Sequence, residues 1–490
     1  PSVWFSYAVC GLLALPSVFM FAELSRLMPI AGGGYAYTYQ SLGSLAGFLT
    51  GWLLALGSIF ACSMYAIGFS FYFGSLLGYE VSAFGSRMIA LLVALLLTGL
   101  NCRGAKGGDR FQRVFTWGNL TVLAVLIVSA VSEADTARLT PMFPNGFDGA
   151  VAAIALIYIS FFGYQLIANN AEEVVNPTKT VPQAMLLSML VSLSFYVAVA
   201  LAAVLVVPWQ ELAASQAPLV EVASRTLGKN GWFFIAIGGV LASAAALNST
   251  LLSQGRQIYA MGKNGFLPPL LGRIHETQKT PNAALLAGGG LTAAAAVFGD
   301  LEFVAKSANF CFISSLVVVS LALRKVSRTS GKQQSLWKRW LPIFALICNL
   351  VLLVTLDWLS FLFGLHLLAA GGAVYLFYSR SRENRSRFGM SVTLTERPDA
   401  FFKRGTRILS PMANPETQSA IFSISQSLLA RGGGEIVVLS VVNAPEQVDF
   451  HSALMDSQNS VDVLERSTKF ERFMHVMLRP VVRVSRDLAR

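Results

Sequence analysis

One long apolar segment of the chain is interrupted by residues that can hydrogen-bond. Residues 146–168 are mostly apolar, yet Ser160, Gly163 and Gln165 lie within six positions of one another inside this segment. About 20 apolar residues are enough for a helix to cross a bilayer. At that depth an unpaired backbone group costs several kcal/mol, so a broken helix is tolerated only where it lines protein or a water-filled cavity. Such a break frees amide and carbonyl groups to bind a small charged solute.

A continuous helix is the alternative interpretation of the same segment. Small residues are enriched where membrane helices pack closely, so Ser160 and Gly163 can also serve packing alone. Taken by themselves, the residues of this segment leave both interpretations open.

The composition places the whole chain in a membrane. Hydrophobic residues make up 54% and charged residues 13% of its 490 residues, and the mean hydropathy is +0.58. A soluble domain carries about 25% charged residues. The net charge of +11 is typical of some nucleic-acid-binding proteins, but here the basic residues lie in short loops between apolar runs and in the C-terminal tail. Their placement is a topology signal, and no nucleic-acid partner is expected.

The residues that most often form metal and catalytic sites are scattered. The histidines are His275, His366, His451 and His475, and the cysteines are Cys10, Cys62, Cys102, Cys311 and Cys348. Neither set has the spacing of a metal site, and no nucleophile lies beside a base. We therefore expect no metal, no cofactor and no enzymatic activity. His366 lies within an apolar run, where we expect a neutral, hydrogen-bonded ring.

About eleven apolar runs are long enough to be membrane helices. They cover residues 2–25, 44–77, 87–101, 114–132, 147–171, 184–207, 232–254, 282–299, 303–323, 340–356 and 358–378. Lysines and arginines concentrate in alternate loops, at residues 26, 103–113, 179, 256–279 and 324–339. The positive-inside rule puts those loops and the C-terminus in the cytoplasm. An odd number of spans then puts Pro1 outside, and we expect one further span before it.

Two blocks of sequence resemble the amino acid/polyamine/organocation permeases. Residues 161–164 (Phe-Phe-Gly-Tyr), followed by residues 171–177 (Ala-Glu-Glu-Val-Val-Asn-Pro), resemble the sixth helix of that family. Residues 256–268 resemble the end of its eighth helix and the cytoplasmic hairpin that closes its inner gate. Residues 21–35 are similar to its second helix and the loop after it, so the resemblance also implies a first helix upstream of Pro1.

The resemblance implies an all-α fold and a set of binding residues. The fold is the LeuT-type five-plus-five inverted repeat lacking its first helix, in a membrane domain of residues 1–378. In the family, the ammonium group of the substrate meets backbone carbonyls of the broken sixth helix, here Tyr158 to Phe161, and its carboxylate meets the first helix. The implied substrate-binding residues are Tyr158, Ile159, Ser160, Phe161, Phe162, Gly163 and Gln165.

Within that set the resemblance also implies individual roles. Phe161 or Phe162 is the aromatic gate over the substrate, and Gly163 supplies a flexible break. Gln165 stands where relatives often have an acid. Without a buried negative charge to pair a cationic side chain, we expect a neutral amino acid.

Two further residues bear on a coupling ion. Asn119 lies where many bacterial members carry a lysine, and an amide does not titrate in the useful range. Ser243 lies about where relatives with a sodium site use a hydroxyl, but its neighbour Ala242 offers none. Hydrogen bonding between helices for Asn119 and close packing for Ser243 are the alternatives. Coupling to H⁺ or Na⁺ stays open.

Several features outside these blocks are predicted to be structural. Gly32, Gly33 and Gly34 form a tight turn between helices, because no strand precedes them and no Lys-Ser/Thr follows, as a phosphate-binding loop requires. Gly43, Gly47 and Gly51 repeat at four-residue spacing and indicate a close-packing face. The acids Glu23, Glu172 and Glu173 lie at cytoplasmic helix ends, where gating or loop pairing is expected.

The C-terminal region changes in composition. Residues 379–404 are a basic linker, which either lies on anionic lipid or is solvated. Within residues 405–490, a strand at 407–411, a helix at 415–431 and a strand at 435–442 predict one βαβ unit. This cytoplasmic unit resembles the first half of a universal stress protein domain. That family's nucleotide-binding glycines and the acid after its first strand have no counterpart, since Ala413 and Asn414 stand in the place of the acid, so we expect no ATP binding.

Two functions are compatible with these features. The first is a secondary active transporter that moves amino acids or related amines by alternating access, in a plasma (inner) membrane of the bacterial type. The second is a non-transporting amino acid sensor that signals through its cytoplasmic tail. Both place the chain in a lipid bilayer.

Overall fold

The computed structural model forms two units, Pro1–Glu383 and Asn384–Arg490, which are treated separately below. It describes residues 1–28, 32–78, 81–104, 108–144, 146–169, 174–228, 231–275, 277–329, 336–382, 391–394, 406–411, 434–443 and 477–485. The predictions for Glu172, Glu173, Ala413, Asn414 and the helix at 415–431 fall outside these residues, as does most of the linker.

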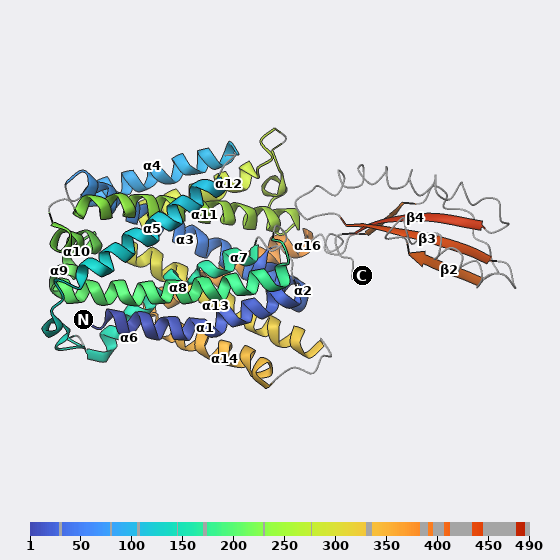
Figure 1. The fold of residues 1–490 in the computed structure, drawn as a ribbon. Coiled ribbons are helices and arrows are strands. Elements are labelled where there is room, and N and C mark those ends of the chain that lie inside the picture. The colour runs from blue at the N-terminus through green and yellow to red at the C-terminus, as the bar shows by residue number, and fades with distance from the viewer. Residues whose placement is uncertain are drawn as a thin grey trace. The chain divides into compact units, whose positions relative to one another are not determined.

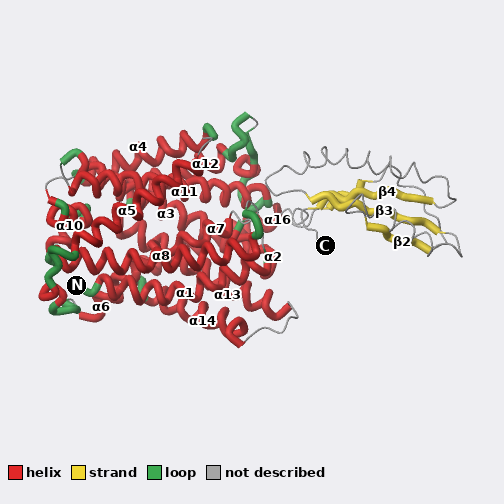
Figure 2. Tube along the Cα trace, in the orientation of Figure 1, coloured by secondary structure: helices red, strands yellow, loops and turns green. Residues whose placement is uncertain are grey.

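The described part of the first unit is helical (Figure 2). Its helices are α1 (Val3–Leu27), α2 (Gly33–Leu42), α3 (Ser44–Leu76), α4 (Ala83–Cys102), α5 (Gly108–Ala130), η1 (Thr136–Leu139), α6 (Gly146–Ile157), η2 (Tyr158–Tyr164), α7 (Gln165–Asn169), α8 (Pro177–Val206), α9 (Trp209–Ala214), α10 (Pro218–Thr226), α11 (Gly231–Lys263), η5 (Pro269–Gly272), α12 (Asn282–Phe298), α13 (Leu301–Thr329), α14 (Leu336–Val354), α15 (Trp358–Val374), η6 (Tyr375–Ser379) and α16 (Arg380–Arg382).

Most of these helices are long and apolar enough to cross a membrane. Among the described residues, 8 helical segments qualify by length and composition, with α6, η2 and α7 counted together. Shorter apolar helices cover Thr116–Ala130, Asn282–Phe298 and Arg339–Val354. All of them overlap apolar runs predicted above, so the chain is an integral membrane protein with several membrane-spanning helices. The exact number of spans stays a prediction.

Some helix ends differ from the apolar runs because polar residues continue a helix beyond its apolar part. Helix α8 begins at Pro177, several residues before the run at 184, since proline fits the first turn of a helix and Asn176 takes the left-handed conformation with φ 54°. Helix α11 continues through Arg256 to Lys263. Helix α2 was not expected; it begins within the predicted glycine turn, at Gly33, where Gly32 has φ 98° and Gly33 has φ 51°.

The short helices lie at the two ends of the bundle. Helices α2 and α16 lie at one end, and α9 and α10 lie at the other, together with Pro1 (Figure 1). This agrees with the alternation of loops deduced from charge. Which of the two ends faces the cytoplasm stays a prediction.

Helix α3 is the most buried of the candidate spans, with 72% of its apolar window inside the protein. Gly47 and Gly51 let neighbours approach, as the four-residue spacing predicted, but Gly43 does not, because a Cβ atom there would meet nothing within 4 Å. A Cβ atom on Gly47 would lie 2.6 Å from the Cβ of Tyr39, and one on Gly51 would lie 2.8 Å from Cδ2 of Tyr35. The glycine face therefore receives the aromatic side chains of α2.

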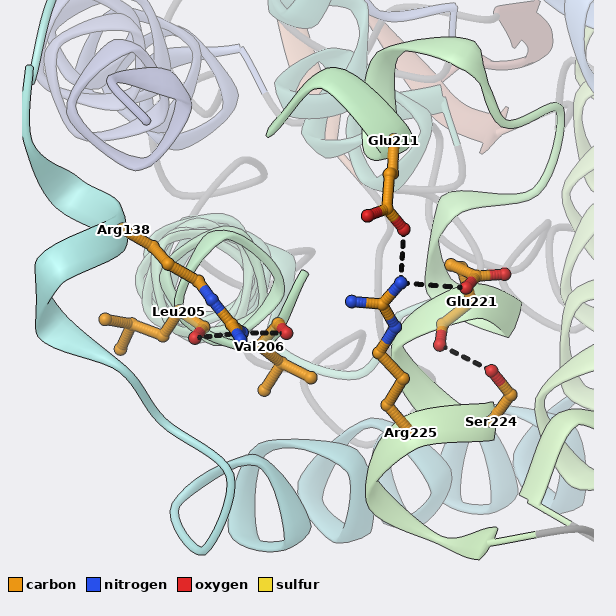
Figure 3. A network of polar contacts seen from close by, with 7 residues as sticks. All are labelled: Arg138, Leu205, Val206, Glu211, Glu221, Ser224 and Arg225. Carbon is orange, nitrogen blue, oxygen red and sulfur yellow. Dashed lines mark hydrogen bonds and ion pairs between the residues drawn. The ribbon is translucent and has the colours of Figure 1, made fainter. Parts of the chain in front are cut away.

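Charged groups stabilise the end of the bundle that holds α9 and α10 (Figure 3). Arg138 donates hydrogen bonds to the carbonyl oxygens of Leu205, at 3.0 Å, and of Val206. Arg225 on α10 pairs with Glu211 on α9 and lies 3.5 Å from Glu221. Because the last carbonyls of a helix have no partners within it, Arg138 caps the end of α8.

A second ionic group joins α13 to α15. The Nζ atom of Lys306 lies 2.5 Å from Oε1 of Glu302 and 2.9 Å from Oδ1 of Asp357. Asp357 also caps α15 by accepting a hydrogen bond from the amide of Ser360.

His366, further along α15, bonds through Nδ1 to the carbonyl oxygen of Leu362 at 2.8 Å, which confirms the prediction of a hydrogen-bonded histidine.

The second unit contains one sheet of four described strands. The strands are β1 (Ser391–Leu394), β2 (Thr406–Pro411), β3 (Gly434–Asn443) and β4 (Met477–Ser485), in the order β1-β4-β3-β2. β2 and β3 are parallel, with Thr406 opposite Gly434, as a βαβ unit requires. The helix between them and the likeness to a universal stress protein stay predictions. β1 lies inside the predicted linker and pairs antiparallel with β4, for which no element was predicted.

Candidate functional site

The segment that interrupts the long apolar run is not a continuous α-helix. The α-helix α6 ends at Ile157, residues Tyr158–Tyr164 form the 3₁₀ helix η2, and α-helix resumes in α7 at Gln165. Runs of 3₁₀ helix longer than 3–4 residues are uncommon, and inside an α-helix they often mark a functional hinge. The break expected here takes the form of a tightened helix, and the alternative of one continuous α-helix is wrong.

Helix η2 lies inside the protein. The side chains of Tyr158, Ile159, Phe161, Phe162 and Tyr164 are each less than 5% exposed. A change of helix type at this depth agrees with the rule that irregular backbone in a membrane is surrounded by protein or a cavity.

Two side chains from distant helices bind carbonyl groups of this segment. Asn309 on α13 donates from Nδ2 to the carbonyl oxygen of Ala155 at 2.5 Å and contacts that of Leu156 at 3.4 Å. Tyr196 on α8 donates its hydroxyl to the carbonyl oxygen of Ser160 at 3.1 Å. Donors are therefore supplied at the end of α6 and in the middle of η2.

The two candidate gate residues have different aromatic neighbours. The ring of Phe161 lies edge-on to Tyr7 of α1, at 6.2 Å between centroids, and to Tyr196, at 5.3 Å. Phe162 stacks on Phe312 of α13, with 3.7 Å between centroids. Phe161 thus belongs to an aromatic group shared by α1, η2 and α8, while Phe162 is held against α13. The gate assignment to either residue stays a prediction.

Gly163 and Gln165 lie at the end of the break. Gly163 is exposed, and a Cβ atom added to it would have no heavy atom within 4 Å, so the fold does not require glycine there for space. The Gln165 side chain is 5% exposed, and its Oε1 has no hydrogen-bond partner among the described residues. An unpaired buried acceptor costs about 1–3 kcal/mol, and this oxygen has almost no solvent-accessible surface.

The candidate ion residues lie on other helices. Asn119 is half-buried on α5, and Ser243 is half-buried on α11. The Ser243 hydroxyl faces α3, since a Cβ atom on Gly68 would lie 3.9 Å from its Oγ. No hydrogen bond in the described part of the chain joins either residue to η2. A role for them in ion coupling stays a prediction.

Asn309, Tyr196 and Tyr7 were missed by the sequence reasoning. Asn309 had a usable signal, because it is an amide inside the apolar run at 303–323, and polar groups at membrane depth are functional suspects. Tyr196 and Tyr7 gave no such signal, since aromatic residues are ordinary members of apolar runs.

The other end of the interrupted helix is held closely by α2 and α11. Asn169, the last residue of α7, donates from Nδ2 to the hydroxyl of Ser253 at 3.0 Å. A Cβ atom on Gly33 would lie 2.4 Å from Oδ1 of Asn169. The turn before α2 therefore fits against α7 only because residue 33 is glycine. We call this meeting of Gly33, Asn169 and Ser253 the α2–α7–α11 contact.

The hairpin after α11 is anchored nearby. Phe266 is fully buried, with its ring 5.6 Å from Tyr39 and 6.5 Å from Tyr375. Its carbonyl oxygen accepts a hydrogen bond from Ser379 at 2.7 Å, at the end of the π-helix η6. Asn264 donates to the hydroxyl of Tyr35 at 2.6 Å. The hairpin thus joins α2 to the end of α15.

A bundle of membrane-length helices around a buried, interrupted helix defines a class of protein. Discontinuous helices of this kind form the substrate sites of membrane transporters, where free backbone groups and helix ends face the solute. The fold and the site therefore assign the chain to the polytopic membrane transporters.

The chain belongs to the amino acid permease family, whose model matches residues 1–377. A methylthioribose transporter of Bacillus subtilis is 28% identical over 402 residues, which cover 78% of this chain and 86% of that protein. A branched-chain amino acid permease of the same organism is 28% identical over 405 residues, with the same coverage of both chains. A cationic amino acid transporter of Arabidopsis thaliana is 27% identical over 351 residues, covering 66% of this chain and 59% of that protein.

Proposed function

We propose that this protein is a secondary active transporter that moves amino acids or related amines across a membrane by alternating access. The observation that carries the proposal is the buried 3₁₀ segment Tyr158–Tyr164 between two α-helical pieces. In this proposal the carbonyls of Tyr158–Phe161 bind the substrate ammonium, Phe161 or Phe162 closes over it, and Gly163 and Gln165 complete the site. The family match and the names of the relatives support an amino acid as the substrate.

A neutral amino acid is the proposed substrate. Among the described residues, the fully buried polar side chains are serine, threonine, asparagine and glutamine, and no carboxylate, lysine, arginine or histidine is among them. A cationic or anionic substrate side chain would need a buried partner of opposite charge to offset its desolvation. The relatives' names include branched-chain and cationic amino acids, and those specificities are theirs.

Uptake into proteoliposomes tests the proposal. Purified full-length protein is reconstituted, and uptake of radiolabelled neutral amino acids is measured with a proton or a sodium gradient imposed in turn. We expect concentrative uptake of at least one of them, and its loss in Phe161→Ala. Phe234→Ala is the matched control, because Phe234 is 64% exposed on α11, where its ring lies edge-on to Phe233. Equal uptake by empty liposomes and by protein would refute the proposal.

The coupling ion is part of the same test. If sodium drives uptake, we expect Ser243→Ala to weaken the dependence of uptake on sodium. If protons drive uptake, we expect Asn119→Ala to leave the dependence on protons unchanged, because an amide does not titrate. The bacterial-type plasma membrane and the cytoplasmic C-terminus belong to the proposal as well. Protease cleavage of the tail in inside-out vesicles, but not in whole cells, tests the orientation.

A sensor is the second candidate function. The observation that favours it is the separate second unit with its own sheet, since a carrier does not need such a unit for transport. A sensor binds an amino acid tightly and does not carry it. Saturable binding to the purified protein, with no uptake under either gradient, would select this candidate over the carrier.

A further inference from the structure

Asn309 is a buried amide that contacts the interrupted helix from the side of α13. Its side chain is fully buried, and Nδ2 donates to the carbonyl oxygen of Ala155 at 2.5 Å, with that of Leu156 at 3.4 Å. These carbonyls belong to the last turn of α6, directly before η2 begins at Tyr158. Asn309 therefore touches the backbone at the junction between the two helix types.

The junction is where the backbone needs an external donor. The last carbonyls of an α-helix have no regular partners within it, and the hydrogen bonds of a 3₁₀ helix are poorer in geometry. In a membrane, water is not at hand to replace them. The Asn309 amide supplies such a donor to the carbonyl of Ala155.

The same helix also holds the middle of η2. Phe312, about one turn after Asn309, stacks on Phe162 with 3.7 Å between ring centroids. A leucine at 309 would fill the space without burying a polar group, and Oδ1 of Asn309 has no partner among the described residues. Packing alone therefore does not favour an amide at this position, because a buried polar group is unfavourable unless its hydrogen bonds are useful.

We propose that Asn309 is a positioning residue for the solute site. It fixes the junction between α6 and η2, and thereby the direction in which the carbonyls of Tyr158–Phe161 point. It acts through the backbone of the break and need not touch the solute. The proposal rests on the function proposed above, because it assigns Asn309 a part in the same site.

Asn309→Asp tests the donor role through pH. An aspartic acid has nearly the same shape, and when protonated it still has one O–H to donate, whereas the ionised form donates nothing and repels the carbonyl oxygen. Burial raises the pKa of such a carboxyl, which brings its titration toward neutral pH. We expect substrate exchange by Asn309→Asp, divided by that of the unmodified protein at each pH, to fall about tenfold between pH 5 and pH 8. Asn309→Leu should stay low throughout, mainly through a raised KM.

Asn349 on α14 provides the matched control. It is also a fully buried amide, and its Oδ1 accepts a hydrogen bond from Ser17 at 3.1 Å, with no hydrogen bond to residues 155–164. Asn349→Asp introduces the same buried acid at a side chain that bonds none of the carbonyls of residues 155–164. We expect its exchange activity, relative to the unmodified protein, to show no tenfold dependence on pH.

Hydrogen exchange of the backbone gives a reading that does not depend on transport. In Asn309→Leu, the amides of residues 155–164 should exchange about tenfold faster, while Asn349→Leu leaves them unchanged. Unchanged exchange in Asn309→Leu, or a pH profile of Asn309→Asp equal to that of Asn349→Asp, would overturn the positioning role. Absence of transport by the unmodified protein would instead count against the proposed function, and the hydrogen-exchange comparison would still decide the role of Asn309.

Discussion

Substitution of Gly33 by alanine is expected to separate the α2–α7–α11 contact. The new Cβ atom would lie 2.4 Å from Oδ1 of Asn169, closer than real contacts allow. The Asn169 side chain must then move and give up its hydrogen bond to Ser253, which is worth about 1 kcal/mol. Once the amide has moved, the nearest neighbours of the new Cβ atom are Cγ of Asn169 and Cβ of Ala168, at ordinary contact distances of 3.5 and 3.6 Å, so the overlap adds little beyond the lost hydrogen bond.

The loss of this hydrogen bond acts on one conformation only, the one in which α2, α7 and α11 meet. A penalty of about 1 kcal/mol on that conformation shifts the equilibrium toward the separated one by about fivefold. In a transporter that alternates between two states, separation of this contact opens the end of the bundle that holds α2. We therefore expect residues buried beneath the contact to become accessible.

Cysteine labelling measures this change. Ala168 is fully buried beside Gly33, so a cysteine in its place reacts with a membrane-impermeant thiol reagent only when the contact separates. The background carries Cys102→Ser, because the other native cysteines are buried. Inside-out vesicles expose the end of the bundle that is proposed to face the cytoplasm. There Gly33→Ala and Ser253→Ala, which both remove the hydrogen bond, should each raise the labelling rate about fivefold.

Gly43→Ala separates backbone strain from the steric effect. Gly43 also has a positive φ, of 97°, but a Cβ atom there would meet nothing within 4 Å. This variant should strain the turn without opening the contact. If Gly33→Ala and Gly43→Ala label at the same rate, within twofold, the reasoning from the Gly33–Asn169 overlap is refuted.

Three further outcomes follow from the contacts around the site. Tyr196→Phe removes the hydrogen bond to the Ser160 carbonyl. Substrate affinity should therefore fall about 2- to 10-fold with little loss of thermal stability. An unchanged KM would contradict this prediction. Phe266→Ala empties a fully buried site and should cost about 3–5 kcal/mol in stability, seen as a lower unfolding temperature in detergent than that of Phe266→Leu. Burial by itself raises the pKa of the Asp357 carboxyl. The hydrogen bonds that this carboxyl accepts, chiefly from Lys306, and the positive charge of Lys306 have the opposite and larger effect. The pKa is therefore lowered from 3.8 to about 2. The unmodified protein should therefore be more stable than Asp357→Asn by a constant amount above about pH 4, and this difference should vanish as the pH falls toward 2. A difference in unfolding temperature between the two proteins that does not change with pH would refute this prediction.

A local signal in the sequence raised the possibility of an interrupted helix, and the family resemblance of residues 161–164 and 171–177 favoured it over a continuous helix. Ser160, Gly163 and Gln165 stand inside an apolar run, and the cost of polar groups in a membrane applies to each residue by itself. The sequence did not predict the kind of interruption. Whether the backbone frays or tightens depends on the donors that reach it, and those come from Asn309 and Tyr196 on helices elsewhere in the chain.

The sequence by itself determined which segments are apolar and long enough to cross a membrane, and which family the chain resembles. Both depend on runs of neighbouring residues, since partition into a bilayer is decided within one helix length. Only the tertiary structure decided what holds the break and the end of the bundle near α2. Asn309 meets Ala155 across 154 positions, and Gly33 meets Asn169. Such contacts depend on how whole helices pack, because the side chains that fill one helix's grooves come from other helices, and no local pattern specifies those partners.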